Sequence, residues 1–278
     1  MVGASLAAAL AGCGRRVLLI ESVPFGDAAQ PSFDERTTAL GNASRRIFAG
    51  LGVWDAIAPE AAAIRVIHVS EAGRFGFARL TAAEQRIDAL GYVVANRRIG
   101  AALWSRLAAA SDLLLRVPAR VSDVDIATDD VRFSVTTAGG MSERVLTRLM
   151  VAADGAHSQI RAAAGIAAAV EDYNQVAVVA NVAADRPHAS VAYERFTAAG
   201  PLAVLPLFDG TLAVIWASRP ERAAELLALD DTAYLAQLQR QFGWWLVAEP
   251  TFRNPFLVPR PRVDQRYKPI RSIVQRGP

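Results

Sequence analysis

The chain is 278 residues long, and its hydrophobic content of 53% excludes a disordered chain and allows a large buried core. Its 30 basic residues are nearly balanced by 27 acidic ones, and the two signs are mixed along the sequence, so no nucleic-acid-binding function is expected. The single cysteine, Cys13, excludes an internal disulfide and a cysteine zinc site, and it suits a reducing compartment.

The first predicted elements are a helix near residues 2–12 and a strand near residues 17–21. Small apolar residues with helical spacing fill the first segment, and a Gly-Cys-Gly turn ends it. This order is typical of the second half of a βαβ unit that binds a dinucleotide. Gly3 then occupies the place of the third glycine in G-x-G-x-x-G, and Glu21 fits the acid that accepts hydrogen bonds from ribose hydroxyls. A helix followed by a strand also occurs in sheets that bind no ligand.

Periodicity and turn signals predict helices and strands interleaved through the rest of the chain, which indicates an α/β fold. Helices are predicted near residues 36–50, 98–110, 158–165, 220–228 and 231–242. Strands are predicted near residues 64–70, 113–126, 130–137, 144–153, 174–184, 191–196, 201–207 and 211–217. Turn residues at 128–130 and at 208–210 predict two β-hairpins.

An acidic residue separates one apolar run from a predicted helix. Residues 149–153 are apolar and lead directly into Asp154 and Gly155. An acid at the carboxyl end of a buried strand, followed by a turn and a helix, is where open α/β folds place ligands. The alternative is an ordinary Asp-Gly turn, with Ser158 as the helix N-cap and Arg161 exposed to solvent.

The pattern D-G-x-x-S-x-x-R at residues 154–161 resembles the second fingerprint of the FAD-dependent aromatic hydroxylases. Further segments resemble one subgroup, the ubiquinone-biosynthesis hydroxylases of the 2-polyprenyl-6-methoxyphenol hydroxylase type. These segments include R-T-T-A-L-G at 36–41, L-G-V-W at 51–54, D-Y-N-Q-V-A at 172–177 and E-R-F-T at 194–197. The resemblance covers most of the chain from residue 1 to about residue 217.

This resemblance implies an α/β fold in which a Rossmann-like FAD-binding domain of the para-hydroxybenzoate hydroxylase type is interleaved with a β-sheet substrate domain. The FAD-binding domain would comprise residues 1–68 and 92–165, without its first strand. The substrate domain would comprise residues 69–91 and 166–258. Residues 259–278 would be a connector or an aberrant tail.

The resemblance also implies which residues contact FAD, namely Gly3, Glu21, Arg36 and Asp154. No catalytic residue is assigned, because the flavin and its reductant carry the chemistry in such enzymes. The three histidines lack the spacing of a metal site, so no metal is expected. The apolar strand at residues 200–207 is the expected wall of an apolar substrate pocket.

The implied function is an FAD- and NAD(P)H-dependent monooxygenase that uses dioxygen to hydroxylate a polyprenylated phenol in ubiquinone biosynthesis. The implied location is cytoplasmic, with peripheral contact at the inner membrane and contact with a ubiquinone-biosynthesis complex. No run approaches the about 20 apolar residues needed to span a bilayer.

Several family features have no match in the sequence. These are the first strand, the first two glycines of the fingerprint and a late G-D-A-A-H motif, so we expect a chain truncated at both ends. The chain would be inactive if this loss prevents it from holding FAD. Two alternatives therefore remain open: a non-enzymatic remnant that binds a lipid or a partner, and a related flavin oxidoreductase with another substrate.

Overall fold

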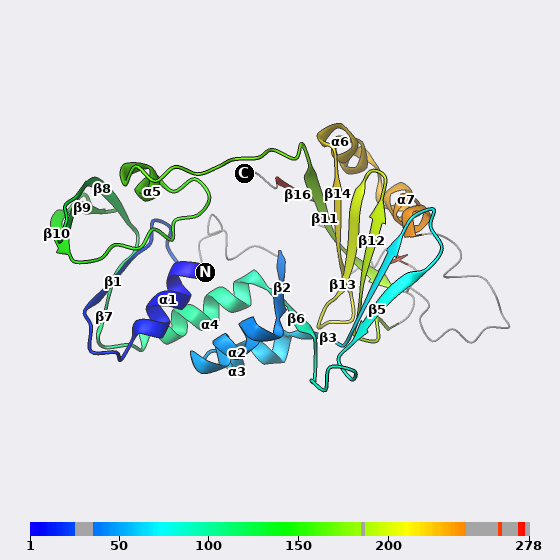
Figure 1. Ribbon diagram of the computed structural model, residues 1–278, viewed down its shortest axis with the longest axis horizontal. Coiled ribbons are helices and arrows are strands. Elements are labelled where there is room, and N and C mark those ends of the chain that lie inside the picture. The colour runs from blue at the N-terminus through cyan, green and yellow to red at the C-terminus, as the bar shows by residue number, and fades with distance from the viewer. Residues whose placement is uncertain (26–35, 185–186, 243–260, 263–271, 276–278) are drawn as a thin grey trace. The chain divides into compact units, whose positions relative to one another are not determined.

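The computed structural model describes residues 1–25, 36–184, 187–242, 261–262 and 272–275. The chain forms two compact units, each assembled from separate stretches of the sequence (Figure 1). The first unit comprises residues 1–35, 46–59 and 95–171, and the second comprises residues 36–45, 60–94 and 172–278. The predicted mixed α/β fold is confirmed. The assignment of one unit to FAD and the other to substrate stays a prediction.

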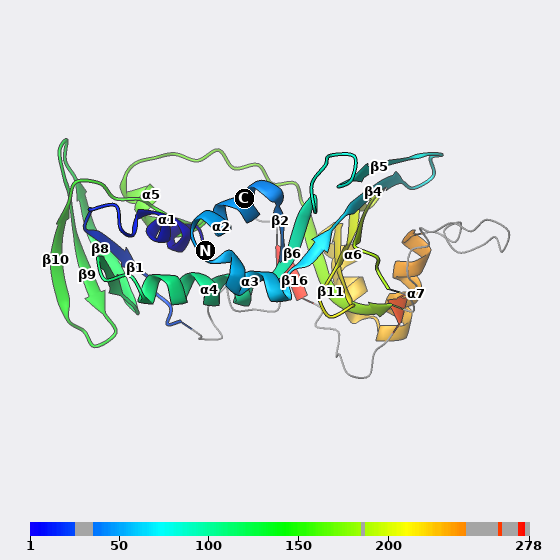
Figure 2. The same cartoon turned by 90° about the horizontal axis from the view of Figure 1, so that it is seen from below.

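A two-stranded parallel sheet lies in the first unit. Strand β1 (Val17–Ile20) pairs with β7 (Leu113–Arg116). Helix α1 (Val2–Leu10) packs against α4 (Asn96–Ala108), and the two lie side by side in Figures 1 and 2. The predicted helix and strand at the start of the chain are thus confirmed. This unit also contains helices α3 (Trp54–Ile57) and α5 (Gln159–Ala163), and the 3-10 turn η1 (Ala58–Glu60) lies at its boundary with the second unit.

An antiparallel sheet of three strands completes the first unit, in the order β10-β9-β8. Its strands are β8 (Ala119–Ile126), β9 (Val131–Thr137) and β10 (Ser142–Thr147). Alternate residues Val131, Phe133 and Val135 of β9 are buried on one face. The predicted hairpin at residues 128–130 is confirmed, since the N–H of Ala127 donates to the carbonyl of Asp130 at 2.9 Å.

One large, mostly antiparallel sheet organises the second unit, in the order β15-β11-β14-β13-β12-β4-β5, with β16 also paired to β11. The hairpin predicted at residues 208–210 joins β13 to β14 and is confirmed. The strands are β4 (Val66–Glu71), β5 (Phe77–Thr81), β11 (Val176–Ala184), β12 (Val191–Thr197), β13 (Gly200–Pro206), β14 (Leu212–Ser218), β15 (Pro261–Arg262) and β16 (Ser272–Gln275).

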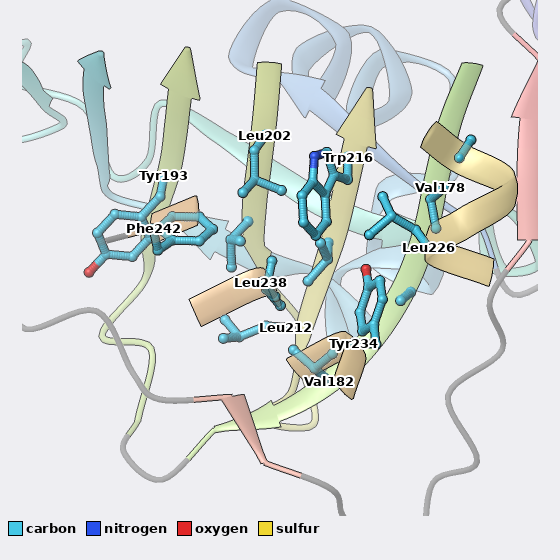
Figure 3. Packing of buried hydrophobic residues seen from close by; sticks show 14 of the residues in the cluster. Val178, Val182, Tyr193, Leu202, Leu212, Trp216, Leu226, Tyr234, Leu238 and Phe242 are labelled. Atoms are coloured by element: carbon cyan, nitrogen blue, oxygen red, sulfur yellow. The ribbon is translucent and has the colours of Figure 1, made fainter. Parts of the chain in front are cut away.

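Helices α6 (Pro220–Ala228) and α7 (Asp231–Phe242) cover one face of this sheet. Trp216 of β14 is 1% exposed and lies among side chains from both helices and from neighbouring strands. Figure 3 shows its indole ring among Leu202, Leu226 and Leu238. This cluster is the largest buried core of the part of the chain that the structure describes.

A small sheet lies against the opposite face, in the order β2-β6-β3. Its strands are β2 (Thr37–Gly41), β6 (Gly91–Ala95) and β3 (Ala62–Ile64). Ile64 and Val93 pack there against Ala192, Leu207 and Ala213 of the large sheet and its connections. The two faces of the large sheet are therefore both buried over part of their area.

The helix predicted at residues 36–50 is only half correct. Residues 37–41 form β2, and helix α2 begins afterwards (Asn42–Gly50). Two neighbouring threonines favour a strand, because β-branched residues fit a pleated surface. A Cβ atom on Gly91 of β6 would lie 2.6 Å from the carbonyl oxygen of Leu40, so only glycine allows this close approach of the two strands.

Two predicted strands also differ from the structure in their extent. The strand predicted at residues 113–126 is divided into β7 and β8, which belong to different sheets, and Pro118 between them has no N–H to donate. The strand predicted at residues 144–153 ends with β10 at Thr147. None of the helices in the described ranges is long and apolar enough to cross a membrane.

Candidate cofactor-binding site

Gly3 lies close to the two segments that lead into the predicted carboxylates of the first unit. A Cβ atom on Gly3 would lie 3.1 Å from the Cβ of Ala153 and 3.9 Å from Cδ1 of Leu19. Ala153 immediately precedes Asp154, and Leu19 is two residues before Glu21. The start of α1 therefore touches both segments that lead into the predicted carboxylates. A larger side chain at position 3 would push these segments away from the helix.

Glu21 follows the last residue of β1 and has a fixed backbone. Its N–H donates to the carbonyl of Arg116 at 3.1 Å, and its own carbonyl accepts from the N–H of Ala119 at 2.9 Å. The side chain is half-buried, and Oε1 accepts from the N–H of Val23 at 3.0 Å. The carboxylate is thus held at the carboxyl end of a parallel strand pair, the edge where such sheets bind ligands.

Asp154 accepts hydrogen bonds from the start of α5. Ser158 Oγ donates to Oδ1 at 2.5 Å, and the N–H groups of Gln159 and Ile160 donate to Oδ2 at 3.0 and 3.4 Å. The hydroxyl of Ser158 in turn accepts from the N–H of Arg161 at 2.9 Å, which confirms Ser158 as the N-cap.

The Arg161 side chain closes the same turn, because its Nη1 donates to the carbonyl of Ala156 at 2.9 Å. The three polar residues of the D-G-x-x-S-x-x-R pattern therefore hold one another within a single turn. The interpretation of this pattern as a turn that starts a helix, with Ser158 as N-cap, is correct. Binding of a ligand by Asp154 would be a second role of the same turn.

The Asp154 carboxylate keeps its negative charge at neutral pH. Desolvation by burial acts to raise its pKa, but the hydrogen bonds from Ser158 and from backbone N–H groups outweigh it, and the pKa is lowered from 3.8. The residue remains exposed to solvent. It can therefore accept a further hydrogen bond from an incoming hydroxyl group.

The expected buried strand before Asp154 is not present. Residues 148–153 form no strand with any part of the chain that the structure describes, and Leu149 and Val151 are 75% and 55% exposed. A strand requires a hydrogen-bonded partner, and the apolar character of this run does not supply one. Asp154 is positioned by the turn itself and by the approach of Ala153 to Gly3.

Sequence comparison identifies the family of the chain. A family model described as an FAD binding domain matches residues 1–268. The chain belongs to this FAD-binding family. FAD presents ribose hydroxyl donors, and the carboxylates of Glu21 and Asp154 are acceptors, so the residues present are chemically suited to the family's cofactor.

Curated relatives include ubiquinone hydroxylase UbiL of Rhodospirillum rubrum, 34% identical over 243 residues, which cover 87% of this chain and 56% of that protein. The 3-demethoxyubiquinol 3-hydroxylase of Escherichia coli is 33% identical over 247 residues, which cover 87% of this chain and 61% of that protein. The human mitochondrial ubiquinone biosynthesis monooxygenase is 29% identical over 266 residues, which cover 90% of this chain and 56% of that protein. The resemblance to ubiquinone hydroxylases is confirmed, and the chain spans little more than half the length of these relatives.

Solved structures of FAD-binding monooxygenases share the fold. The p-nitrophenol 4-monooxygenase of Pseudomonas putida has a TM-score of 0.66 and 19% identity, and the match covers 87% of this chain and 59% of that one. Pseudomonas aeruginosa PqsL in complex with 2-aminobenzoylacetate has a TM-score of 0.68 and 20% identity, and the match covers 86% of this chain and 64% of that one. These similarities establish the architecture.

Arg36 belongs to the second unit, where it immediately precedes β2. Its predicted contact with FAD in this family stays a prediction. Arg98, in the first turn of α4, donates from Nη2 to the carbonyl of Ala56 at 3.0 Å. It therefore ties α4 to α3 within the first unit.

If Glu21 holds a ribose hydroxyl, replacing it by alanine should raise the dissociation constant for FAD about tenfold, equivalent to about 1.4 kcal/mol. The thermal midpoint without FAD should change little, because the hydrogen bonds that this side chain accepts within the described residues come from its neighbours Ser22 and Val23. Titration of the Glu21→Ala variant with FAD, followed by flavin fluorescence, measures the change. An unaltered dissociation constant would make Glu21 a residue of the turn alone.

The second unit contains a buried cationic cluster that was not predicted. His68 of β4 is 4% exposed, its Nδ1 accepts from Arg79 Nη2 at 3.3 Å, and its ring stacks on Phe77 with centroids 4.9 Å apart. Arg195 of β12 is also buried and donates from Nη1 to Ser70 Oγ at 3.2 Å. Side chains alternate between the two faces of a strand, and this alternation places His68 and Arg195 on inward-facing positions of β4 and β12. That alternation was the signal in the sequence from which their burial could have been predicted.

This cluster should make the second unit sensitive to acid. Burial, followed by the charges of Arg79 and Arg195, lowers the pKa of His68 from 6.5. The unfolded chain therefore binds a proton that the folded chain does not, and stability is lost as the pH falls from about 6.5 toward the lowered value. This acid sensitivity is tested by measuring the thermal midpoints of the natural chain and of the His68→Gln variant, each at neutral and at mildly acidic pH. The variant should lose less stability in acid, and equal losses would contradict the assignment.

Proposed function

We propose that the chain is part of an FAD- and NAD(P)H-dependent monooxygenase that hydroxylates a polyprenylated phenol in ubiquinone biosynthesis. The family match and the names of the curated relatives support the cofactor and the reaction class. The observation that carries the proposal is the close approach of Gly3 to the segments that end in Glu21 and Asp154. A helix start close to two segments that end in carboxylates suits the binding of a dinucleotide.

The residues of the first unit would bind FAD and orient it. Glu21 and Asp154 would accept hydrogen bonds from ribose hydroxyls, and Gly3 would keep α1 close enough for both. When bound and reduced by NAD(P)H, FAD supplies the electrons that place one atom of dioxygen on the aromatic ring and release the other as water.

Strand β13 would provide one wall of the substrate site, as the sequence indicates. Its residues alternate, so that Leu202 and Val204 point into the core under α6 and α7. Ala203 and Leu205 point to the opposite face, next to Ala213 of β14. Apolar side chains on this face suit contact with a prenylated ring.

Cytoplasmic residence, peripheral contact with the inner membrane and contact with other ubiquinone-biosynthesis proteins form part of this proposal. A polyprenylated phenol partitions into lipid, so the enzyme must collect it from a membrane or from another protein. These three features rest on the resemblance to the ubiquinone hydroxylases.

Turnover with a prenylated phenol tests the proposed function. The chain is incubated with FAD, a polyprenylated 6-methoxyphenol in detergent, and NADH or NADPH, and the products are analysed by mass spectrometry. We expect a product that contains one additional oxygen atom from dioxygen, with one nicotinamide oxidised for each product formed. Turnover with soluble phenols alone would favour a related flavin oxidoreductase, and FAD binding without turnover would favour a non-enzymatic remnant.

A further inference from the structure

One end of the large sheet carries three exposed phenylalanines around the turn between β4 and β5. Phe75 is fully exposed (109%), Phe77 is 57% exposed and Phe196 is 49% exposed. Ser70 of β4 pairs with Phe77, and the N–H of Ala72 donates to the carbonyl of Phe196 at 2.8 Å. Two segments that are distant in the sequence thus place their aromatic residues at the same end of the sheet (Figure 1).

The three rings project in different directions. Ser70 accepts a hydrogen bond from Arg195, which also contacts α7, so Phe77 opposite Ser70 lies on the α7 face. Phe196 follows Arg195 in β12 and therefore lies on the other face. Phe75 is in the turn itself. A rigid protein partner would need a pocket that encloses the end of the sheet, whereas a fluid lipid interface surrounds such a projection without one.

The charge of this hairpin favours a negatively charged surface. The hairpin, residues 66–81, contains two arginines and one glutamate, which leaves a net charge of +1. The guanidinium carbon of Arg79 lies 5.1 Å from the ring centroid of Phe77. Arg74 in the turn is exposed and pairs with Glu71 at 2.9 Å. Arginines beside exposed aromatic rings suit the boundary between anionic headgroups and acyl chains.

We propose that this aromatic turn, residues 71–77 together with Phe196, inserts its phenyl rings into the headgroup region of an anionic lipid bilayer. The inference rests on the proposed function, because a polyprenylated substrate would be dissolved in such a bilayer. The turn then determines which end of the second unit meets the membrane. Phe77 also packs on buried His68, so Phe75 is the residue of choice for a test.

Co-sedimentation of the whole chain with lipid vesicles tests this proposal. Vesicles of phosphatidylcholine are compared with vesicles that also contain phosphatidylglycerol. The matched control is Phe208→Ser, because Phe208 is 53% exposed in a turn at the hairpin between β13 and β14. We expect Phe75→Ser to weaken partitioning into the anionic vesicles about tenfold or more, whereas Phe208→Ser leaves it unchanged and Phe75→Trp retains it.

Equal weakening by Phe75→Ser and Phe208→Ser would overturn the proposal. It would also be overturned if the natural chain bound neither kind of vesicle, or bound both equally well. The assay contains no phenol and no nicotinamide, so its result is independent of catalysis. Vesicle binding without hydroxylation would refute the proposed function alone, and hydroxylation without vesicle binding would refute the docking proposal alone.

Discussion

Replacing Trp216 by alanine should lower the free energy of unfolding of the second unit by about 3–5 kcal/mol. The indole is 1% exposed in the core between the large sheet and its two covering helices (Figure 3). Its ring centroid lies 6.1 Å from that of Tyr234 on α7, so the substitution also removes an aromatic contact between sheet and helix. Such a loss approaches the total stability of many domains, about 5–15 kcal/mol.

Urea unfolding of the Trp216→Ala variant, followed by circular dichroism, measures this effect. Phe208→Ala is the matched control, because its aromatic ring is 53% exposed and the substitution should change stability by less than about 0.5 kcal/mol. A similar small change for both variants would show that α6 and α7 do not depend on this core. The assignment of the sheet and its helices as one cooperative unit would then be wrong.

Strands and helices with a clear periodicity could be predicted from the sequence. Strands β11 to β14 and helices α6 and α7 lie close to their predicted positions, because alternation and helical spacing are both strong there. The errors occur where tertiary pairing decides the structure. Residues 37–41 become a strand because β6 lies beside them, and residues 149–153 stay outside any strand because no described segment pairs with them.

The candidate site could be predicted where it depends on local chemistry. Gly3 and Glu21 follow from the spacing of a βαβ unit, and the Asp154 turn follows from its capping pattern. The cluster of His68 and Arg195 could not be predicted in the same way. These residues are far apart in sequence, and only the parallel register of β4 and β12 brings them together.

Replacing Asp154 by alanine should weaken FAD binding by roughly 10- to 150-fold, because a hydrogen bond to a charged acceptor contributes about 1.5–3 kcal/mol. Asp154 is exposed and ionised, and the lowered pKa keeps it an acceptor throughout the neutral range. Titration with FAD and measurement of flavin fluorescence give the two dissociation constants. A ratio close to one would remove Asp154 from the cofactor site.

Ser158→Ala distinguishes a direct contact from an effect on the turn. It removes the hydroxyl that donates to Asp154 and accepts from the N–H of Arg161, but it leaves the carboxylate in place. If Asp154 touches FAD directly, Ser158→Ala should weaken binding much less than Asp154→Ala. Equal effects of the two substitutions would mean that the turn, and not the carboxylate, matters for the cofactor.

Hydrogen–deuterium exchange with and without FAD tests the central claim most directly, because it locates the cofactor on the chain. The close approach of Gly3 to Ala153 and Leu19 predicts that FAD protects three segments together, residues 1–5, 19–23 and 154–161. The β8–β9–β10 sheet of the same unit should exchange at the same rate in both states. Protection that is absent from these three segments, or that falls on the three-stranded sheet instead, would contradict the assignment of this edge as the FAD site.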